Sequence, residues 1–333
     1  IPAYSQKVKA SKEFQTFQFD HSFVLNSLKS SMEGYVFHNQ PLDTDDLLEQ
    51  TVKLFNSCKT SLELFDMLHN MRAYDDSTYA HSLNVALICR RIGKWLKVDA
   101  ATLDTLTLCG LLHDIGKLKI PDEILNKPGK YTDEEFDLVK RHTKFGYELL
   151  KTLNIDPHIK KAALLHHERC DGSGYPLKAT QKDLDDFSMV VAIADVYDAM
   201  TAARSYRAPL CPFQVIERFE QEGLQKYKPK FILTFLQHIA STYQNNRVLL
   251  SNGQSANIVM LNQQHLARPI VQLNDNSCID LSTRLDLHIQ SVLRRTITVS
   301  DRSPADLPLR VLLLLLLPFL PVYHSLPVSF QCT

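Results

Sequence analysis

The pair His113-Asp114 places an imidazole beside a carboxylate at the end of an apolar segment, within LLHDIGK over residues 111–117. A His-Asp dipeptide alone is weak evidence for a site, because most such pairs lie at a surface or are satisfied in a core. Lys117 follows three and four residues later, which on a helix puts it on the same face as the pair. A cation there could meet a phosphate oxygen, so this segment is a candidate for phosphate chemistry.

A second group of ligand-type side chains, His166-His167-Glu168, is expected at the end of a helix. Successive helical residues project about 100° apart, so two neighbouring imidazoles can converge on one metal at a helix end. The loop DGSGYP over 171–176 follows, and its two glycines indicate unusual backbone angles or close approach to a ligand. Asp195 lies in the apolar stretch 187–203, where a carboxylate needs a metal or a cation as its partner.

In order, spacing and residue identity, these segments resemble the HD-GYP subgroup of the HD-domain phosphohydrolases. The matching positions are His81, His113-Asp114-x-x-Lys117, His142, His166-His167-Glu168-x-x-Asp171-Gly172-x-Gly174-Tyr175-Pro176, Asp195-x-x-Asp198-Ala199-Met200-Thr201 and Arg204-x-x-Arg207. The resemblance covers about residues 42–243. It implies a helical domain that holds two divalent metal ions, iron or manganese, and that hydrolyses cyclic di-GMP to pGpG and then to GMP.

Carried over position by position, the resemblance implies two metal sites that share one carboxylate. One ion would be held by His81, His113, Asp114 and Asp195, and the second by His142, His166 and His167, with Asp114 bridging the two. Imidazole and carboxylate ligands suit first-row transition metals. Two such ions can share and deprotonate a water and clamp the oxygens of an in-line displacement at phosphorus.

The resemblance also implies which residues meet the substrate. Asp114 and Lys117 are the predicted catalytic residues, with Lys117 neutralising charge in the transition state. Arg204 and Arg207 would grip substrate phosphates, a task that suits bidentate guanidinium groups, and Tyr175 would line the guanine side. Supporting roles, as loop-ordering groups or as partners of the ligands, are expected for Glu168, Asp171, Gly172, Gly174, Pro176 and Asp198.

Two places depart from the family pattern. Some members hold a third metal through a Glu one helical turn before the first His, but this chain has Ser77 there, with Asp75 and Asp76 out of register. We therefore expect two metals. Ala203 and Ser205 stand where the family commonly has an acidic residue and a proline, which could loosen the substrate side without touching a ligand.

Other functions remain open at this point. A related enzyme would hydrolyse 3′,3′-cyclic GMP-AMP, whereas the Gly-Tyr-Pro loop argues against a general nucleotide phosphohydrolase. A protein of the same fold could instead be a non-catalytic scaffold that binds a cyclic dinucleotide or a diguanylate cyclase domain, but such members usually lose ligands or the loop, and neither is lost here. A homodimer is left open. A DNA-binding regulator has little support, since we find no helix-turn-helix segment and no basic stripe.

Composition excludes several classes of protein. The 333 residues carry 37 Lys+Arg and 37 Asp+Glu, and this balance argues against a surface that binds nucleic acid or anionic membrane throughout. Only 10 of the 333 residues are glycine, too few for a Gly-rich nucleotide-binding enzyme or a turn-dense all-β fold. The seven cysteines form no C-x-x-C pair, which indicates free thiols in a reducing cytoplasm.

The elements that must position these residues are mainly helical. Apolar residues at helical spacing predict helices over 42–69, 79–96, 101–112, 132–153, 157–167, 187–203, 212–222 and 229–243. The period then changes, and 248–250 and 258–261 flank a turn at Asn252-Gly253, which predicts a hairpin. Two further short strands are expected at 270–273 and 278–281. The prediction is a mainly α fold, a helical HD-domain bundle with a small β appendage.

This pattern divides the chain into four parts. We predict an unassigned N-terminal segment over 1–41, the HD-GYP helical domain over 42–244, a β-rich appendage over 245–290, and a tail over 291–333 that is disordered or vector-derived. The apolar run in the tail reaches at most 12 residues (311–322), short of the roughly 20 that span a bilayer. With no visible signal peptide, we expect a cytoplasmic location, and the start at Ile1 without Met indicates a fragment or a processed chain.

Overall fold

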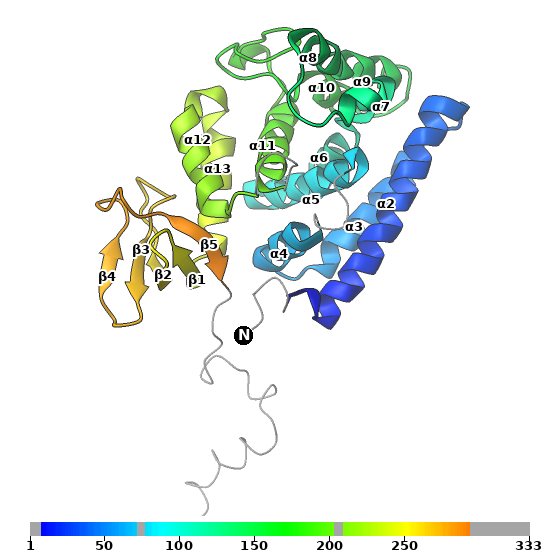
Figure 1. Cartoon of the computed structure of the whole chain (residues 1–333). Helices are drawn as coiled ribbons and strands as arrows, with labels where there is room; N and C mark the ends of the chain where they lie inside the picture. The colour runs from blue at the N-terminus through cyan, green and yellow to red at the C-terminus, as the bar shows by residue number, and fades with distance from the viewer. Residues whose placement is uncertain (1–7, 72–76, 203–208, 294–333) are drawn as a thin grey trace, which may run out of the picture. The chain divides into compact units, whose positions relative to one another are not determined.

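Helices make up most of the chain, and a small antiparallel sheet follows them (Figure 1). The computed structural model describes residues 8–71, 77–202 and 209–293. These belong to one compact unit that ends at Arg294, and the predicted tail falls almost entirely outside the described residues. The predicted fold class, mainly α with a small β appendage, is confirmed. In the described ranges no helix combines the length and the apolar character needed to cross a membrane.

The helices agree with the predicted ranges except at three places and at one short helix over residues 122–125, which was not predicted. Their bounds are α2 (Lys12–His38), α3 (Thr44–Ser57), α4 (Ser61–Met71), α5 (Thr78–Leu96), α6 (Ala100–Leu112), α7 (Asp122–Leu125), α8 (Asp133–Lys140), α9 (His142–Leu150), α10 (Pro157–Leu165), α11 (Asp186–Thr201), α12 (Pro212–Glu222) and α13 (Pro229–Thr242). Short 3₁₀ turns are η1 (Ile115–Lys119), η2 (Gln181–Asp183) and η3 (Leu224–Lys226). The helix predicted over 42–69 is divided at Cys58, and the one over 132–153 is divided at Arg141.

Helix α2 is the third difference, because the segment 1–41 showed no readable motif. The helix is 27 residues long, and the Ser11 side chain caps it by accepting from the Phe14 N–H. Its buried positions, which include Phe14, Phe17 and Leu28, recur at helical spacing and pack on α3 and α5. Three phenylalanines on its exposed side hid this period in the sequence: Phe19, Phe23 and Phe37.

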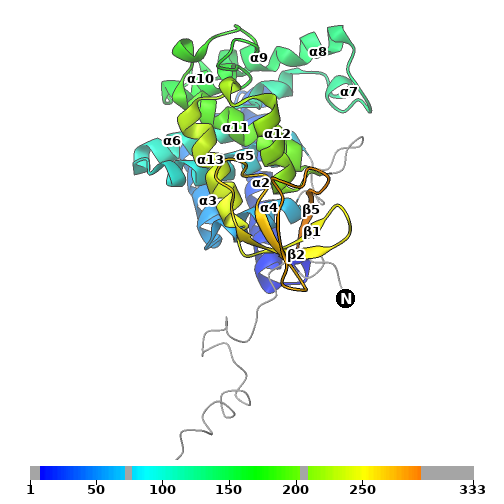
Figure 2. The same cartoon turned by 90° about the vertical axis from the view of Figure 1, so that its left-hand side faces the viewer.

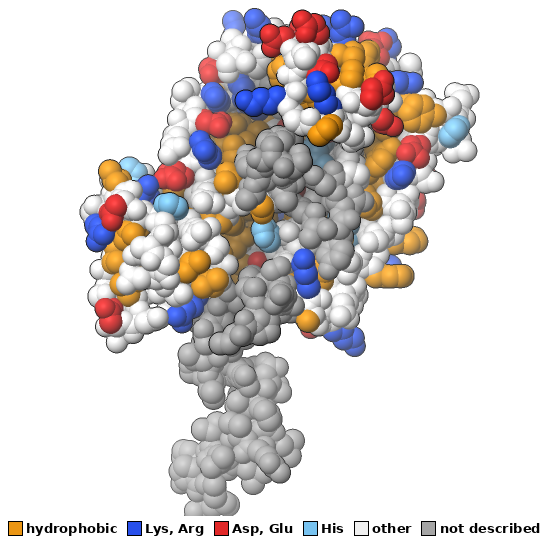
Figure 3. All heavy atoms as spheres, viewed as in Figure 1, with side chains coloured by type: hydrophobic (Ala, Val, Ile, Leu, Met, Phe, Trp, Pro, Cys, Tyr) orange, Lys and Arg blue, Asp and Glu red, His pale blue; other side chains and the backbone are white. Residues whose placement is uncertain are grey.

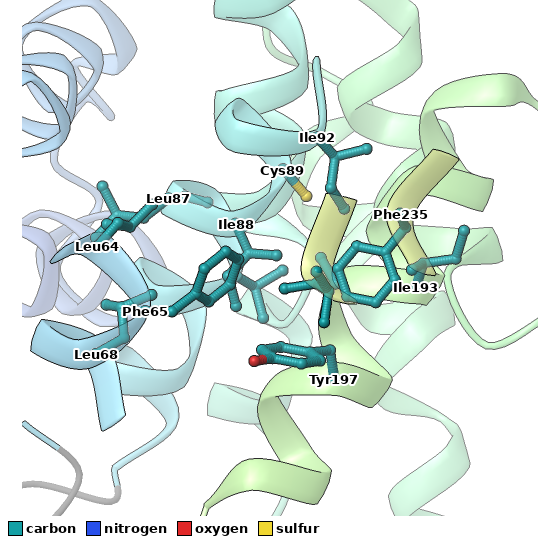
Figure 4. Packing of buried hydrophobic residues seen from close by; sticks show 14 of the residues in the cluster. Leu64, Phe65, Leu68, Leu87, Ile88, Cys89, Ile92, Ile193, Tyr197 and Phe235 are labelled. Carbon is teal, nitrogen blue, oxygen red and sulfur yellow. The ribbon is translucent and has the colours of Figure 1, made fainter. Parts of the chain in front are cut away.

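The core of the helical part lies between α4, α5, α11 and α13 (Figure 4). Tyr197 of α11 is at its centre, with its ring 5.4 Å from Phe65 and 5.3 Å from Phe235, both in edge-on contact. Helix α5 is buried almost all round, from Leu83 to Ile92. Such a close-packed interior holds α5 and α11 rigidly, so the polar side chains at their ends are held in place as well.

The sheet is antiparallel throughout, with strand order β4-β3-β2-β1-β5. The strands are β1 (Arg247–Leu250), β2 (Ser255–Met260), β3 (Ile270–Leu273), β4 (Cys278–Asp280) and β5 (Ile289–Leu293). The predicted hairpin is present as β1 and β2, while β5 was not predicted because it is short and only half-buried. In both views the sheet lies beside α12 and away from α7–α10, so it does not position the site described next (Figures 1 and 2).

Candidate metal centre

Five parts of the chain bring the predicted ligands together in the helical domain. They are His81 on α5, His113 and Asp114 between α6 and η1, His142 at the start of α9, His166 and His167 at the end of α10, and Asp195 on α11. These elements pack directly on one another, α5 on α6 and α11, and α9 on η1 and α10. Most of the seven side chains are buried, so the cluster lies inside the helical domain.

Asp114 lies at the centre of this cluster, and each of its carboxylate oxygens faces a different pair of imidazoles. Its Oδ1 is 3.3 Å from His142 Nε2 and 3.6 Å from His166 Nε2. Its Oδ2 is 3.3 Å from His113 Nε2 and 3.6 Å from His81 Nε2. A carboxylate placed in this way can bridge two cations.

The ligand atoms form two groups that share Asp114. One group contains Asp114, His142, His166 and His167, and the other contains His81, His113 and Asp114, with all ligand atoms of a group within 4.8 Å of one another. Asp195 does not meet that spacing, although it was expected to belong with His81. Its Oδ1 accepts from His81 Nε2 at 3.0 Å, and its Oδ2 is 3.8 Å from His167 Nδ1.

Backbone carbonyls fix the tautomers of three of the histidines. His113 Nδ1 donates to the Gly110 oxygen at 2.8 Å, His142 Nδ1 to the Val139 oxygen at 2.6 Å, and His166 Nδ1 to the Ala162 oxygen at 2.9 Å. A carbonyl can only accept, so in the neutral imidazoles the Nε2 atoms carry lone pairs. All three Nε2 atoms point at the cluster, as metal ligands do.

Several of these lone pairs have no proton to accept. The Nε2 atoms of His142 and His166 face each other at 3.3 Å, and neither carries a proton in the tautomer fixed above. His113 Nε2 and Asp114 Oδ1 are buried without a hydrogen-bond partner among the described residues. Buried unpartnered acceptors are costly. A divalent cation would satisfy them, so the residues present fit a metal centre.

Burial keeps the imidazoles of one group neutral. It lowers the pKa of His142 to about 3 and lowers the pKa values of His166 and His167 as well. A neutral imidazole is the form that binds a metal ion. These three side chains are therefore ready to coordinate at any pH near neutral.

The two carboxylates stay ionised in spite of their burial. Burial alone would raise the pKa of Asp114, but the adjacent Lys117 ammonium outweighs it and holds that pKa well below its usual range. For Asp195 burial again opposes ionisation, and the hydrogen bond from His81 reverses the balance, so its pKa is also low. Ionised carboxylates among neutral imidazoles are the donor set that divalent transition metals prefer.

His81 lies between two carboxylates of α11. Its Nε2 contacts Asp195, and its Nδ1 contacts Asp198 Oδ2 at 2.8 Å. Burial lowers its pKa, but the hydrogen bonds with the two aspartates outweigh burial and raise that pKa to about 9. Asp198 therefore orients this ring, as a carboxylate behind a metal-binding histidine does.

Replacing Asp198 by Asn is expected to weaken divalent-metal binding about 10- to 100-fold, because the amide supports the His81 ring less well than the carboxylate. Calorimetric titration of the metal-free chain with manganese measures this change in affinity. The variant Asp186→Asn, with its carboxylate on the exposed start of α11, is the control and should bind manganese as the unaltered chain does. Equal affinity in the Asp198 variant would show that this carboxylate does not support a ligand.

The loop after α10 is fastened by Glu168, which is fully buried. Its carboxylate accepts from the backbone N–H groups of Leu177 at 2.5 Å and Ala179 at 3.0 Å. Asp171 accepts from the backbone N–H of Ser173 at 3.0 Å and from its hydroxyl at 2.6 Å. The loop is therefore held at both ends by side chains that accept backbone N–H groups.

Glycine is required at one position of this loop for steric reasons. A Cβ atom on Gly174 would lie 2.4 Å from the Glu168 Cα and 2.5 Å from the Arg169 nitrogen, so no larger residue fits against that backbone. Gly172 has a φ of 78°, and Pro176 follows Tyr175 through a cis peptide bond. With Gly174 in place, the Tyr175 ring stacks on the His167 ring, with centroids 4.7 Å apart and planes at 26°.

Replacing Glu168 by Gln is expected to destabilise the loop, since the amide group can accept only one of the two backbone N–H groups and presents a donor to the other. The loss should be about 1–3 kcal/mol of local stability. Amide hydrogen exchange measures it, and faster exchange at Leu177 and Ala179 is the expected result. Unchanged exchange at both amides would refute the role of this carboxylate.

Lys117 pairs with the central carboxylate. Its Nζ lies 2.5 Å from Asp114 Oδ2, and 24% of its side chain is exposed, so its charge is near the cluster and reaches solvent. Ser77, which stands where a third metal ligand occurs in other members, caps α5 by accepting from the Ala80 N–H at 3.2 Å. The remaining predicted residues fall outside the described part of the chain: Arg204, Arg207, Ala203, Ser205, Asp75 and Asp76.

Sequence reasoning missed two residues near the cluster. A Cβ on Gly116 would lie 1.9 Å from the His142 carbonyl oxygen, so this glycine lets η1 and α9 meet. A glycine within LHDIGK, in a chain poor in glycine, was a signal that could have been used. Phe136 on α8 contacts Tyr175, and no spacing in the sequence links them. The chain has eight further histidines outside the motifs. Those that the structure describes do not join the cluster.

The chain belongs to the HD domain family, since the sequence model of that family matches residues 46–231, more than half of the chain. This match confirms the resemblance drawn from the sequence.

Three curated relatives refine the comparison. The chain is 34% identical to the 3′3′-cGAMP-specific phosphodiesterase 2 of Vibrio cholerae over 54% of this chain and 35% of that protein. It is 33% identical to a cyclic di-GMP phosphodiesterase of Pseudomonas aeruginosa, over 62% of this chain and 50% of the relative. It is 35% identical to the cyclic di-GMP phosphodiesterase of Thermotoga maritima, over 53% of this chain and 48% of the relative. The chain thus spans half or less of the length of these relatives.

Proposed function

We propose that this chain is a metal-dependent phosphodiesterase that hydrolyses cyclic di-GMP to linear pGpG and then to GMP. The observation that carries the proposal is the arrangement around Asp114, whose two oxygens face two separate pairs of imidazole Nε2 atoms. Relatives named as cyclic dinucleotide phosphodiesterases support the choice of substrate.

In this proposal two divalent ions occupy the cluster, and iron or manganese is the expected metal. One ion would be held by His81, His113, Asp114 and Asp195, and the second by His142, His166 and His167. Asp114 would be a ligand of both ions. When bound, such a pair supplies an activated water and neutralises charge during an in-line displacement at phosphorus. The water oxygen becomes part of the new 5′-phosphate, and the bond from phosphorus to the 3′-oxygen breaks to leave a 3′-hydroxyl.

The chain's own side chains hold the substrate and balance its charge. Lys117 places a cation at the edge of the cluster, where a phosphate oxygen can meet it. Tyr175, stacked on His167, presents an aromatic surface to a base. Arg204 and Arg207 are proposed to grip the phosphates. The loop residues Glu168, Asp171, Gly172, Gly174 and Pro176 are proposed to shape this side of the site.

Further proposals concern the segments of the chain, its location and its partners. We propose the division of the chain into segments 1–41, 42–244, 245–290 and 291–333, a cytoplasmic location, and docking of diguanylate cyclase domains through the Gly-Tyr-Pro loop. A homodimer is compatible with these assignments. A loop-dependent interaction with a cyclase domain and no turnover would favour the non-catalytic scaffold over the enzyme.

A second substrate, 3′,3′-cyclic GMP-AMP, is supported by the name of the Vibrio cholerae relative. The test is to incubate the metal-loaded chain under reducing conditions with each cyclic dinucleotide separately and to compare the values of kcat/KM. Faster opening of cyclic di-GMP supports the main proposal, and faster opening of cyclic GMP-AMP supports the second. No linear product from either substrate would refute both.

A further inference from the structure

Phe136 is an aromatic side chain on the surface and does not belong to the hydrophobic core. It lies on α8, whose first turn is acidic and whose one buried residue is Val139. The side chain of Phe136 is 45% exposed. Figure 3 shows hydrophobic side chains among the charged ones over this end of the molecule, around α8 and α9. A solvent-exposed phenylalanine contributes little to the stability of the fold, so the contacts of its ring are more informative than its burial.

These contacts connect Phe136 to the metal centre through a row of rings. Its ring meets Tyr175 edge-on, with centroids 6.3 Å apart and planes at 78°. Tyr175 in turn stacks on His167, whose ring belongs to the ligand group of Asp114. The exposed Phe136 ring on α8 therefore extends the aromatic surface of Tyr175 in the direction away from the metal ligands.

A cation accompanies the phenylalanine. Lys140 Nζ lies over the Phe136 ring, 5.0 Å from its centroid, and also pairs with Asp137 at 2.5 Å. Cations over aromatic faces are attracted by the ring quadrupole, and aromatic faces stack on bases whatever their identity. An aromatic ring with an ammonium group beside it suits a ligand that carries both a base and a phosphate.

We propose that Phe136, supported by Lys140, is a base-stacking position for the cyclic dinucleotide and acts as a positioning residue rather than in the chemistry. The inference rests on the proposed function and extends it to α8, outside the HD and Gly-Tyr-Pro motifs. One base stacks beyond Tyr175 on the Phe136 ring, while the phosphodiester between the two nucleosides lies over the metal centre.

The first test compares Phe136→Ala with Phe37→Ala, since Phe37 is similarly exposed but lies on α2. Loss of base stacking is worth about a tenfold change in binding. Phe136→Ala should therefore raise the KM for cyclic di-GMP about tenfold with little change in kcat. Phe136→Trp should restore the KM, and Phe37→Ala should leave it unaltered.

The second test detects stacking without turnover. The chain has a single tryptophan, Trp95, so Phe136→Trp adds one fluorophore to a constant background. A phosphorothioate analogue of cyclic di-GMP should quench the added fluorescence in metal-loaded Phe136→Trp and should not do so in Phe37→Trp. Calorimetry with the same analogue measures binding to the unaltered chain.

The outcomes separate this inference from the proposed function. If the unaltered chain binds the analogue and hydrolyses cyclic di-GMP, while Phe136→Ala keeps its KM and Phe136→Trp is not quenched, the inference is wrong and the proposed function stands. If the unaltered chain neither binds nor hydrolyses any cyclic dinucleotide, both are wrong. Quenching together with the raised KM supports the inference.

Discussion

Replacing Asp114 by Asn is expected to remove bound metal from the chain and to lower kcat for cyclic di-GMP by a factor on the order of a thousand or more. The reason is that both oxygens of Asp114 face imidazole pairs, so this single carboxylate belongs to both ligand groups. An amide keeps the shape but loses the charge and offers one oxygen in place of two. Elemental analysis and product chromatography measure the two effects.

A matched control for this variant is Asp286→Asn. That carboxylate pairs with Arg284 on the surface of the sheet part and is 61% exposed, so its loss should change neither metal content nor turnover. Full turnover in the Asp114 variant would show that the site has been wrongly assigned. Retained metal with lost turnover would place Asp114 in the chemistry without a bridging role.

Replacing Gly116 by Ala is expected to destabilise the chain by about 3 kcal/mol and to displace the ligand group that contains His142. The added Cβ would lie 1.9 Å from the His142 carbonyl oxygen and 2.4 Å from the Gly146 nitrogen. Both contacts are backbone atoms that cannot turn aside, so η1 and α9 must separate. Denaturant unfolding measures the stability, and elemental analysis measures the metal content.

The comparison variant is Gly253→Ala in the turn between β1 and β2. Nothing lies within 4 Å of its added Cβ, and the cost comes from a φ of 81°, about 1–2 kcal/mol. This variant should lose some stability but keep all of its metal. If Gly116→Ala keeps its metal content as well, the contact between η1 and α9 does not hold His142 in place.

The sequence predicted elements well where apolar periods were regular and undisturbed. Helix α2 was missed because Phe19, Phe23 and Phe37 are apolar but exposed, which broadens the apolar stripe beyond one face. Strand β5 was missed because only its first residue, Ile289, is buried. Burial of this kind depends on distant partners and cannot be seen in a local pattern.

For the site, residue types could be predicted, but their contacts could not. Histidines and aspartates at family spacings indicated metal chemistry, yet nothing local showed that Gly110, Val139 and Ala162 carbonyls would fix three ring tautomers. Those bonds follow from helix ends meeting in the fold. The same holds for Phe136, whose contact with Tyr175 joins segments 39 residues apart along the chain.

The proposed metal-dependent hydrolysis is tested most directly by measuring metal content and product in one preparation. The chain is purified without oxygen, loaded with iron or manganese, analysed for metal and incubated with cyclic di-GMP, and the products are separated by chromatography. We expect two metal ions per chain and the appearance of pGpG followed by GMP. A preparation that contains two metal ions per chain and leaves cyclic di-GMP intact would contradict this expectation.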